Sequence, residues 1–325
     1  MARRGRRTVI LAALALVLAA CGGDDGGTES AGGGATAGGL IGFSQANNGD
    51  VWRIDQTKDV QGNCSSLMPG SQVVVTDGQG QAAKQSADVD DLLARGVKVL
   101  LLTPLTAEAL TPVAKRAMDA GVPVITLDRA VDTDVTQHIG ADNKLIGQKA
   151  AEYVASTVLG GKGGRVIEIQ GVLGASATTD RNKEFVGWLK ENAPNVEIVA
   201  SQTGEYRREP ALKYMEDMLQ RFGPGEFDVV YAHNDEMALG AIQALKAANR
   251  LDEVKVVGID GQNEAIQAIA DGDMAATFTY DNAGKEACQS AQKLLAGEKN
   301  LEKQWVLQTT QIDATNAAEW VGKGF

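Results

Sequence analysis

Polar residues suited to binding hydroxyl groups stand at the ends of several apolar runs. Asp128 and Arg129 end one run. Asn234 and Asp260 end two others. Carboxylates accept hydrogen bonds from hydroxyls, arginine donates through a planar fork, and asparagine does both. Ligands bind beyond the carboxyl ends of strands in open α/β sheets, so these residues predict a site for a polyhydroxylated molecule such as a sugar.

Catalysis by the same residues is the alternative hypothesis. Asp128 and Asp260 could form the carboxylate pair of a glycosidase, and His233 beside Asn234 could activate a nucleophile. Each carboxylate, however, adjoins a residue better suited to binding than to proton transfer. The two histidines, His138 and His233, lie in unrelated segments, which do not form a metal-ligand cluster. We therefore predict a binding protein without catalytic residues, metal or cofactor.

Two glycine-rich segments come near to nucleotide-binding motifs. Gly78–Ala83 matches the dinucleotide pattern G-x-G-x-x-A, but it follows the second predicted strand and no acid lies about 20 residues further on. Gly160–Gly164 lacks the spacing of a phosphate-binding loop and the Ser or Thr after its lysine. We predict that both segments are turns.

The apolar runs predict the elements that position the polar residues. Most runs lack polar alternation, which indicates strands buried on both faces of a parallel sheet. Between them lie amphipathic stretches; in one, Leu110, Val113, Ala114 and Ala117 recur at helical spacing, and Gly121 is predicted to end the helix. The alternation predicts an α/β, doubly wound fold. The expected strands are Leu40–Ser44, Val73–Thr76, Val97–Thr103, Val122–Asp128, Arg165–Gln170, Ile198–Gln202, Phe227–His233, Lys255–Asp260 and Ala275–Tyr280.

The two halves of the chain repeat one pattern. Strand ends at Thr103 and Asp128 are 25 residues apart, and those at Asn234 and Asp260 are 26 apart. The segment from residue 40 onward is also longer than a typical single domain. We predict two similar lobes.

The N-terminal segment predicts export. Four arginines within the first seven residues precede an apolar run from Thr8 to Ala20, the order of a signal peptide, here 1–20. Leu18–Cys21 looks like the lipobox of bacterial lipoproteins, so Cys21 is predicted to carry a lipid; an ordinary secretory signal with an incidental cysteine is the alternative. Residues 21–39 hold almost only small and acidic residues after Cys21 and are predicted to be a lipidated flexible tether.

Net charge bears on the binding partners of the chain, and its cysteines bear on a possible disulfide. Without the signal peptide, 27 basic residues face 42 acidic ones, since the signal holds four of the 31 basic residues. Such a chain is not expected to bind nucleic acid, which requires clustered Lys and Arg. Cys64 and Cys288 are the two thiols left besides Cys21, and an oxidising compartment favours a disulfide between them.

From Leu40 to about Ala296 the chain resembles the periplasmic sugar-binding proteins of the ribose and galactofuranose type. The galactofuranose binder is the more similar of the two in the quoted segments. The ribose form has a pair of phenylalanines where this chain has Gly49–Val51, which argues against a ribose pocket. The galactofuranose form has an acid near Gly49, so a galactofuranose pocket depends on whether Asp50 replaces that acid. The segments that carry the resemblance are Gly42–Gln45, Trp52-Arg53, Val124–Arg129, Ala141–Asn143, Val166–Gly171, Asp180-Arg181, Tyr231–Met237 and Ile259–Gly261.

The resemblance implies the ligand-binding set. It assigns hydrogen bonds to the sugar from Asp128, Arg129, Arg181, Asn234 and Asp260, with Asn48 and Arg53 contributing from the first lobe, and stacking or rim contacts from Trp52, Tyr206 and Tyr280.

The resemblance also implies the division of the chain. The first lobe comprises 40–140 and 281–304, and the second 141–280 and 305–325. In that topology the helices of Cys64 and Cys288 lie on one face of a sheet, which again predicts their disulfide. The lobes would close on the sugar about a hinge.

The implied function is the extracytoplasmic, lipid-anchored solute-binding component of an ABC sugar importer. The ligand would be a monosaccharide, galactofuranose or a related furanose or pentose. The chain has no ATP-binding motif, so the permease and ATPase would be separate subunits, and we expect a monomer that touches the membrane through its lipid alone. The alternatives are a sugar sensor that presents its ligand to a chemoreceptor or sensor kinase, and a secreted glycosidase. A sugar-responsive repressor is disfavoured by the export signal.

Overall fold

The computed structural model describes residues 38–325. The predicted signal peptide, the lipidation site Cys21 and all but the last two residues of the predicted tether lie outside the described residues. Across 38–325, none of the helices combines the length and the apolar character needed to cross a bilayer.

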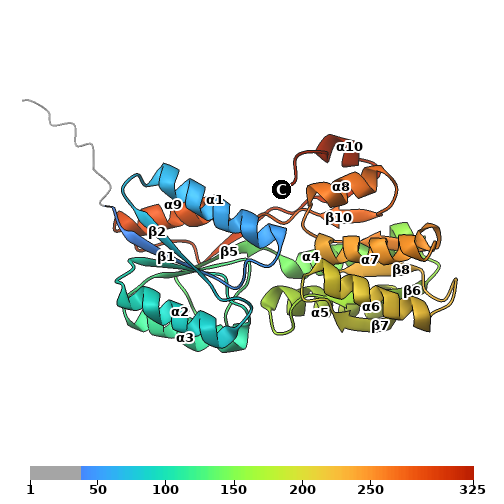
Figure 1. Ribbon diagram of the computed structural model, residues 1–325, viewed down its shortest axis with the longest axis horizontal. Helices are drawn as coiled ribbons and strands as arrows, with labels where there is room; N and C mark the ends of the chain where they lie inside the picture. Colours follow the sequence, from blue (N-terminus) through green and yellow to red (C-terminus); the bar gives the residue numbers. More distant parts are fainter. Residues whose placement is uncertain (1–37) are drawn as a thin grey trace, which may run out of the picture. The chain divides into compact units, whose positions relative to one another are not determined.

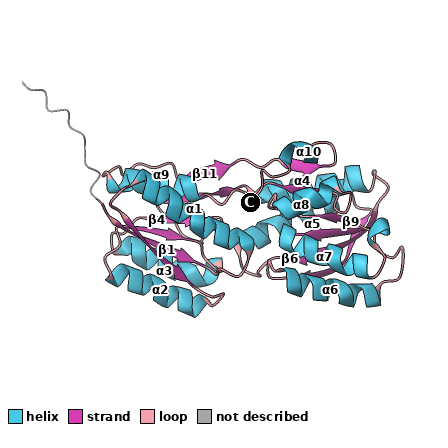
Figure 2. Cartoon of the chain, turned by 45° about the horizontal axis from the view of Figure 1, so that its top comes forward, coloured by secondary structure: helices cyan, strands magenta, loops and turns pink. Residues whose placement is uncertain are grey.

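Two six-stranded sheets form the body, each with helices on both faces (Figures 1 and 2). All neighbouring strands run parallel, apart from β12, which is antiparallel to β10. The fold class is therefore α/β with two doubly wound lobes, as predicted. The first sheet has the order β11 (Gln304–Leu307), β5 (Gln137–Ala141), β4 (Val124–Leu127), β3 (Val99–Leu102), β1 (Leu40–Gln45), β2 (Gln72–Asp77). The second has the order β12 (Gln311–Asp313), β10 (Ala276–Phe278), β9 (Lys255–Val257), β8 (Val229–Ala232), β6 (Gly164–Gln170), β7 (Val196–Thr203).

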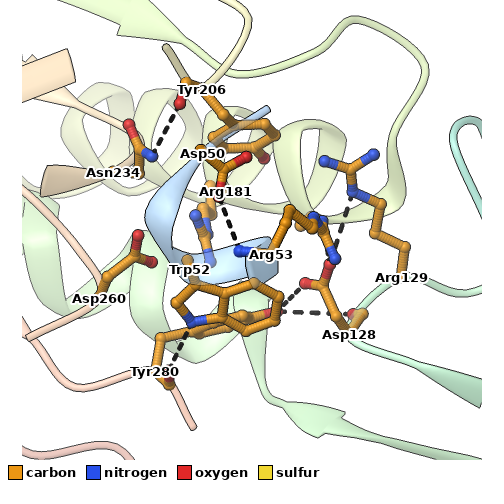
Figure 3. A pocket seen from close by; sticks show the side chains of 11 residues that line it. Asp50, Trp52, Arg53, Asp128, Arg129, Arg181, Tyr206, Asn234, Asp260 and Tyr280 are labelled. Carbon is orange, nitrogen blue, oxygen red and sulfur yellow. Dashed lines mark hydrogen bonds and ion pairs between the residues drawn. The ribbon is translucent and has the colours of Figure 1, made fainter. Parts of the chain in front are cut away.

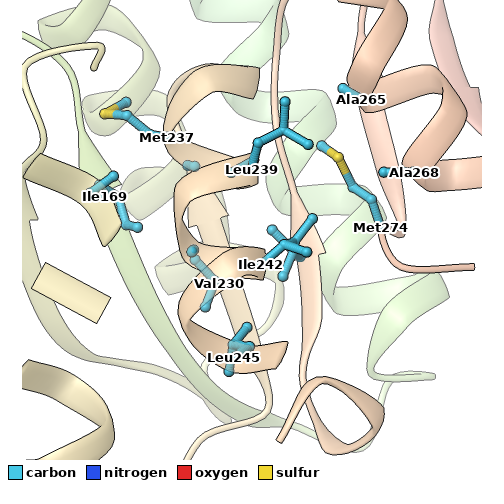
Figure 4. Close-up of a cluster of buried hydrophobic side chains, with 14 of the residues drawn as sticks. Ile169, Val230, Met237, Leu239, Ile242, Leu245, Ala265, Ala268 and Met274 are labelled. Atoms are coloured by element: carbon cyan, nitrogen blue, oxygen red, sulfur yellow. The ribbon is translucent and has the colours of Figure 1, made fainter. Parts of the chain in front are cut away.

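Each lobe has two hydrophobic cores, one on either face of its sheet. The central strands β3, β4 and β8 are buried along their whole length, which explains why their sequences do not alternate. Figure 4 shows the core where α7 and α8 cover the second sheet. In the first lobe α1 (Val51–Leu67) and α9 (Gly284–Leu295) cover one face and α2 (Ala82–Ala94) and α3 (Ala107–Asp119) the other. In the second, α4 (Asn143–Glu152) and α5 (Ser176–Asn192) cover one face, and α6 (Arg208–Arg221), α7 (Asp235–Ala247) and α8 (Asn263–Ala270) the other.

Local signals in the sequence agree with the ends of several elements. Gly121 follows the end of α3 with φ +79°, the left-handed conformation expected of a helix-ending glycine. The segment Gly78–Ala83 is a turn that leads into α2, with Gln79 and Gly80 at positive φ. Gly160 to Gly163 likewise form a turn, here before β6.

All nine predicted strands have a counterpart, but β5, β11 and β12 were not predicted. They are short and carry polar residues, so they give no apolar run to detect. Two predicted boundaries are also displaced. Divisions at residues 140 and 304 would cut β5 and β11, which pair with each other in the first sheet as far as Ala141 and Leu307. We therefore assign 38–141 with 281–307 to lobe 1 and 142–280 with 308–325 to lobe 2.

Three connections join the lobes. The chain crosses between β5 and α4, between β10 and α9, and between β11 and β12. In lobe 1, Cys64 on α1 and Cys288 on α9 are joined by a disulfide between residues 224 apart in sequence, with their Cα atoms 4.9 Å apart.

Candidate functional site

A cavity lies where the carboxyl ends of the two sheets meet (Figure 3). It has about 330 Å³ of empty space, including the open space at its mouth. Five lining residues come from lobe 1, five from lobe 2, and Tyr280 from a connection between the lobes. The lining residues are Asp50, Trp52, Arg53, Asp128, Arg129, Ala177, Arg181, Tyr206, Asn234, Asp260 and Tyr280.

The lobe 1 wall begins at the N-terminus of α1. Asp50 caps this helix, and its Oδ1 accepts a hydrogen bond from the Arg53 backbone N–H at 2.8 Å. The cap places Trp52 and Arg53 in the first helical turn, where both side chains are buried. The Trp52 indole N–H donates to the Tyr280 carbonyl oxygen at 3.0 Å, which fixes the ring against the connection between the lobes.

Asp128 is the central acceptor of this wall. Its Oδ2 lies 2.5 Å from Arg53 Nη2, and its Oδ1 accepts from the Tyr280 hydroxyl at 2.7 Å. It follows β4 with φ +63°, which turns its side chain back toward the cavity. Burial alone would raise the pKa of Asp128, but Arg53 and Arg129 outweigh burial and lower it. The carboxylate is therefore ionised at neutral pH.

Arg129 has donors without protein acceptors. Its Nη1 donates to the Leu105 carbonyl oxygen at 3.0 Å, whereas its buried Nε has no hydrogen-bond partner among residues 38–325. The guanidinium carbon lies 5.2 Å from the ring centre of Tyr206, which belongs to the other lobe. Arg129 thus offers hydrogen-bond donors to the cavity and contacts both lobes.

The lobe 2 wall is built on α5 and α7. Arg181 on α5 donates from Nε to Asn143 Oδ1 at 2.8 Å and from Nη1 to the His233 carbonyl oxygen. Its guanidinium carbon stands 4.5 Å from the ring centre of Tyr280. Asn234 caps α7 by accepting from the Met237 backbone N–H at 3.0 Å.

Asp260 is a buried carboxylate with no hydrogen-bonded side-chain partner among the described residues. It is 8% exposed and follows β9 at φ +131°. Burial and the neighbouring Asp235 raise its pKa well above the ordinary value. A ligand that donates a hydrogen bond would satisfy this carboxyl group.

The cavity combines equal numbers of arginines and aspartates with aromatic walls. Three arginines and three aspartates line it, together with Trp52, Tyr206 and Tyr280. Trp52 and Tyr280 are tilted by 43° with ring centres 5.6 Å apart. The set suits an uncharged molecule rich in hydroxyls with an apolar face. Across residues 38–325 no group of three His, Cys, Asp or Glu side chains is placed to hold a metal.

The structure brings nine of the ten predicted ligand-binding residues together in this cavity. Asn48 is the exception, since it accepts from the Thr57 hydroxyl at 3.0 Å and lines a neighbouring cleft. The loop before α1 turns there, so that Asp50 faces the cavity instead. Asp50 and Ala177 also line the cavity, although neither is among the predicted ligand-binding residues. A capping pattern before α1 could have indicated Asp50; Ala177 has no signal of its own.

Behind the lobe 2 wall, His233 is buried and paired with Glu168, 3.0 Å from Nε2 to Oε1. This pair agrees with a structural role for His233. Burial lowers the pKa of His233, which favours the neutral imidazole. Burial alone would raise the pKa of Glu168, but hydrogen bonds from His233, Gln170 and Ser201 outweigh it and lower the pKa to about 2.

This shift predicts how acid affects stability. Because the pKa of Glu168 is depressed from 4.5 to about 2 by folding, its contribution is present above pH 4.5 and is lost as the pH falls toward 2. At about 1.4 kcal/mol per unit, the contribution is about 3 kcal/mol. Glu168→Gln should therefore lower the unfolding free energy at neutral pH and flatten its decline between pH 4.5 and 2. Urea unfolding at several pH values measures this; a decline as steep as in the wild type would contradict it.

Comparison with known proteins places the chain in a family. Residues 41–299 match the periplasmic binding protein domain. The ribose import binding protein RbsB of Salmonella typhimurium is 41% identical over 233 residues, 71% of this chain and 76% of the relative. The galactofuranose-binding protein YtfQ of Escherichia coli is 34% identical over 244 residues, 73% of this chain and 76% of the relative.

A solved structure agrees with the whole two-lobed fold. The fructose-binding periplasmic domain of a hybrid two-component system superposes with a TM-score of 0.81 at 32% identity, covering 87% of this chain and 93% of that domain. These relatives are solute-binding proteins, which agrees with the prediction that the chain is not an enzyme. The chain belongs to the periplasmic binding protein family.

Proposed function

We propose that the chain is the extracytoplasmic solute-binding component of an ABC sugar importer and that it holds a monosaccharide in the cavity between its lobes. The observation that carries the proposal is the composition of that cavity. Three arginines and two of the three aspartates are buried there against aromatic rings, and neither the Nε of Arg129 nor the carboxyl group of Asp260 has a hydrogen-bond partner among residues 38–325. The hydroxyl groups of a neutral sugar could satisfy both the free donor and the free carboxyl group.

The proposed ligand is galactofuranose or a related furanose or pentose. Asp50 lines the cavity in the segment where the ribose-binding form has phenylalanines, so this part of the wall is polar. Burial raises the pKa of Asp50. A carboxyl group at this point suits a ligand with a further hydroxyl there, which favours the galactofuranose type even though the ribose relative has the higher overall identity.

Contacts between the lobes support a clamp that closes on its ligand. The Ala107 backbone N–H donates to the Gly174 carbonyl oxygen at 3.0 Å, and the Ala130 N–H donates to Ser176 Oγ at 2.8 Å. Both bonds join lobe 1 to lobe 2 near the cavity. Opening about the three connections would break them and expose the site to solvent. Sugar bound to both walls would favour the closed form, which the importer would recognise.

The remaining parts of the proposal concern the cell surface. Cys21 would carry the lipid that tethers the chain to the membrane, and the lobes would work as a monomer with separate permease and ATPase subunits. The disulfide between Cys64 and Cys288 fits an oxidising compartment.

A sugar sensor is the second candidate. It is favoured by the structural similarity to the periplasmic domain of a two-component system. A sensor and an importer component would bind sugar in the same way and differ in the partner that reads the closed form. Genes for a permease next to this one would favour import.

A thermal-shift screen of the purified protein tests the proposed function. We expect galactose or arabinose, the parent sugars of the proposed furanose ligands, to raise the melting temperature more than ribose, fructose, xylose or inositol. At 100 times its dissociation constant a ligand adds about 2.7 kcal/mol, or a rise of about 5 to 10 °C at about 2 to 4 °C per kcal/mol. If none of these sugars shifts the melting temperature, the ligand is not a monosaccharide of this kind.

A further inference from the structure

A polar cluster around a buried carboxylate lies behind the lobe 2 wall and contributes no lining residue to the cavity. At its centre is Glu168 on β6, whose side chain is 1% exposed. The carboxylate accepts from His233 Nε2 at 3.0 Å, Asn182 Nδ2 at 3.0 Å, Ser201 Oγ at 2.6 Å and Gln170 Nε2 at 3.0 Å. We call these five residues the Glu168 cluster.

Two members of the Glu168 cluster adjoin residues of the cavity. Asn182 follows Arg181 on α5, and His233 precedes Asn234 at the start of α7. The His233 carbonyl oxygen also accepts a hydrogen bond from Arg181 Nη1. One carboxylate is thus bonded to two of the segments that carry the lobe 2 hydrogen-bonding residues, α5 and the turn from β8 into α7.

The two hydrogen bonds of the His233 ring show which ring nitrogen carries the proton and what the ring connects. The Gly171 backbone N–H points at Nδ1, at 3.4 Å, so Nδ1 is the acceptor and Nε2 carries the proton that Glu168 accepts. A neutral imidazole therefore spans from the backbone after β6 to the carboxylate on β6. This fixes the end of β8, and with it the carbonyl oxygen that holds Arg181.

We propose that Glu168, through His233 and Asn182, is the positioning residue for Arg181 and Asn234 in the sugar site. It does not touch the ligand; it holds the guanidinium and the amide in the geometry that the closed cavity requires. The inference rests on the proposed function where sugar affinity is concerned, but the orientation of Arg181 is testable without any sugar.

The test compares Glu168→Gln with a matched control in the same lobe. Glutamine keeps the shape but replaces one of the two acceptor oxygens by an N–H₂ group, which faces side chains that already donate. Leu245→Ala is the control. Leu245 is fully buried near the far end of α7 (Figure 4), so its truncation should lower the stability of the lobe without changing the Glu168 cluster. Each variant is titrated with the sugar that gives the largest thermal shift. Glu168→Gln should lose about tenfold in affinity, because residues of one hydrogen-bond network are coupled. Leu245→Ala should lose none.

A second measurement needs no ligand. The Arg181 Nε–H bonds to Asn143 Oδ1 at 2.8 Å, so its exchange with water, followed by NMR, reports how firmly the guanidinium is held. We expect several-fold faster exchange in Glu168→Gln and an unchanged rate in Leu245→Ala. Should Glu168→Gln fail to fold, Asn182→Ala removes one donor and leaves the carboxylate in place, and it should shift the exchange rate in the same direction.

The outcomes separate the two proposals. Faster Arg181 exchange with no sugar binding in the wild type would leave the positioning role standing and overturn the proposed ligand. Unchanged exchange in the folded cluster variant, or an equal loss of affinity in the Leu245→Ala control, would overturn the positioning role.

Discussion

Asp128→Asn is expected to weaken sugar binding by at least about 30-fold. The Asp128 carboxylate is bonded to Arg53 and to the Tyr280 hydroxyl and lies 3.6 Å from Arg129 Nε. Without its charge, the two buried guanidinium groups of Arg53 and Arg129 lose their paired carboxylate, and Asp50 is the remaining acid that acts on both. Loss of one partner of a buried charge pair costs about 2 to 5 kcal/mol, and about 1.4 kcal/mol corresponds to tenfold in affinity.

Asparagine is the appropriate replacement because Asp128 has φ +63°, a conformation that asparagine tolerates better than alanine. Isothermal titration with the sugar of largest thermal shift measures the loss. Asp90→Asn is the matched control, since Asp90 lies in the same lobe, 54% exposed, and pairs with Arg116 on the surface. Equal affinity in Asp128→Asn and the wild type would show that the sugar binds elsewhere.

Loss of the disulfide is expected to have the second large effect, on stability. The bond links α1 to α9 across 224 residues of sequence, so it restricts the unfolded chain strongly. A native disulfide typically contributes about 2 to 4 kcal/mol, which corresponds to about 5 to 15 °C in a protein of this size. The double variant Cys64→Ala, Cys288→Ala should melt lower by that amount.

Calorimetry with and without a reducing agent measures this effect. The double variant serves as the control, because it has no disulfide to reduce. Reductant should lower the melting temperature of the wild type toward that of the double variant, and it should leave the double variant unchanged. A wild type that is indifferent to reductant, with two thiols open to alkylation without reduction, would rule out the bond in the mature protein.

Most of the fold could be predicted because strands buried on both faces are continuous apolar runs. These runs are easily distinguished from the amphipathic helices between them, in which apolar residues recur at helical spacing. The doubly wound class and all nine expected strands came from that pattern. β5 and the edge strands β11 and β12 did not come from it. They are short strands next to the crossings between the lobes and need few apolar residues, and their pairing partners are set by the path of the chain. The displacement of the lobe boundaries from 140 to 141 and from 304 to 307 has the same cause.

The candidate site divides in the same way. Residue types at strand ends were enough to predict a site for a hydroxyl-rich ligand, since open parallel sheets bring their carboxyl ends to one edge. Tertiary structure decided which side chains face the cavity: the loop before α1 turns Asp50 inward and leaves Asn48 bonded to Thr57. Loop direction depends on packing between distant segments, which local sequence does not specify. For the same reason the sequence could not predict the hydrogen bonds that connect Glu168 through His233 to Arg181. These three residues lie in different segments, which only the folded lobe brings together.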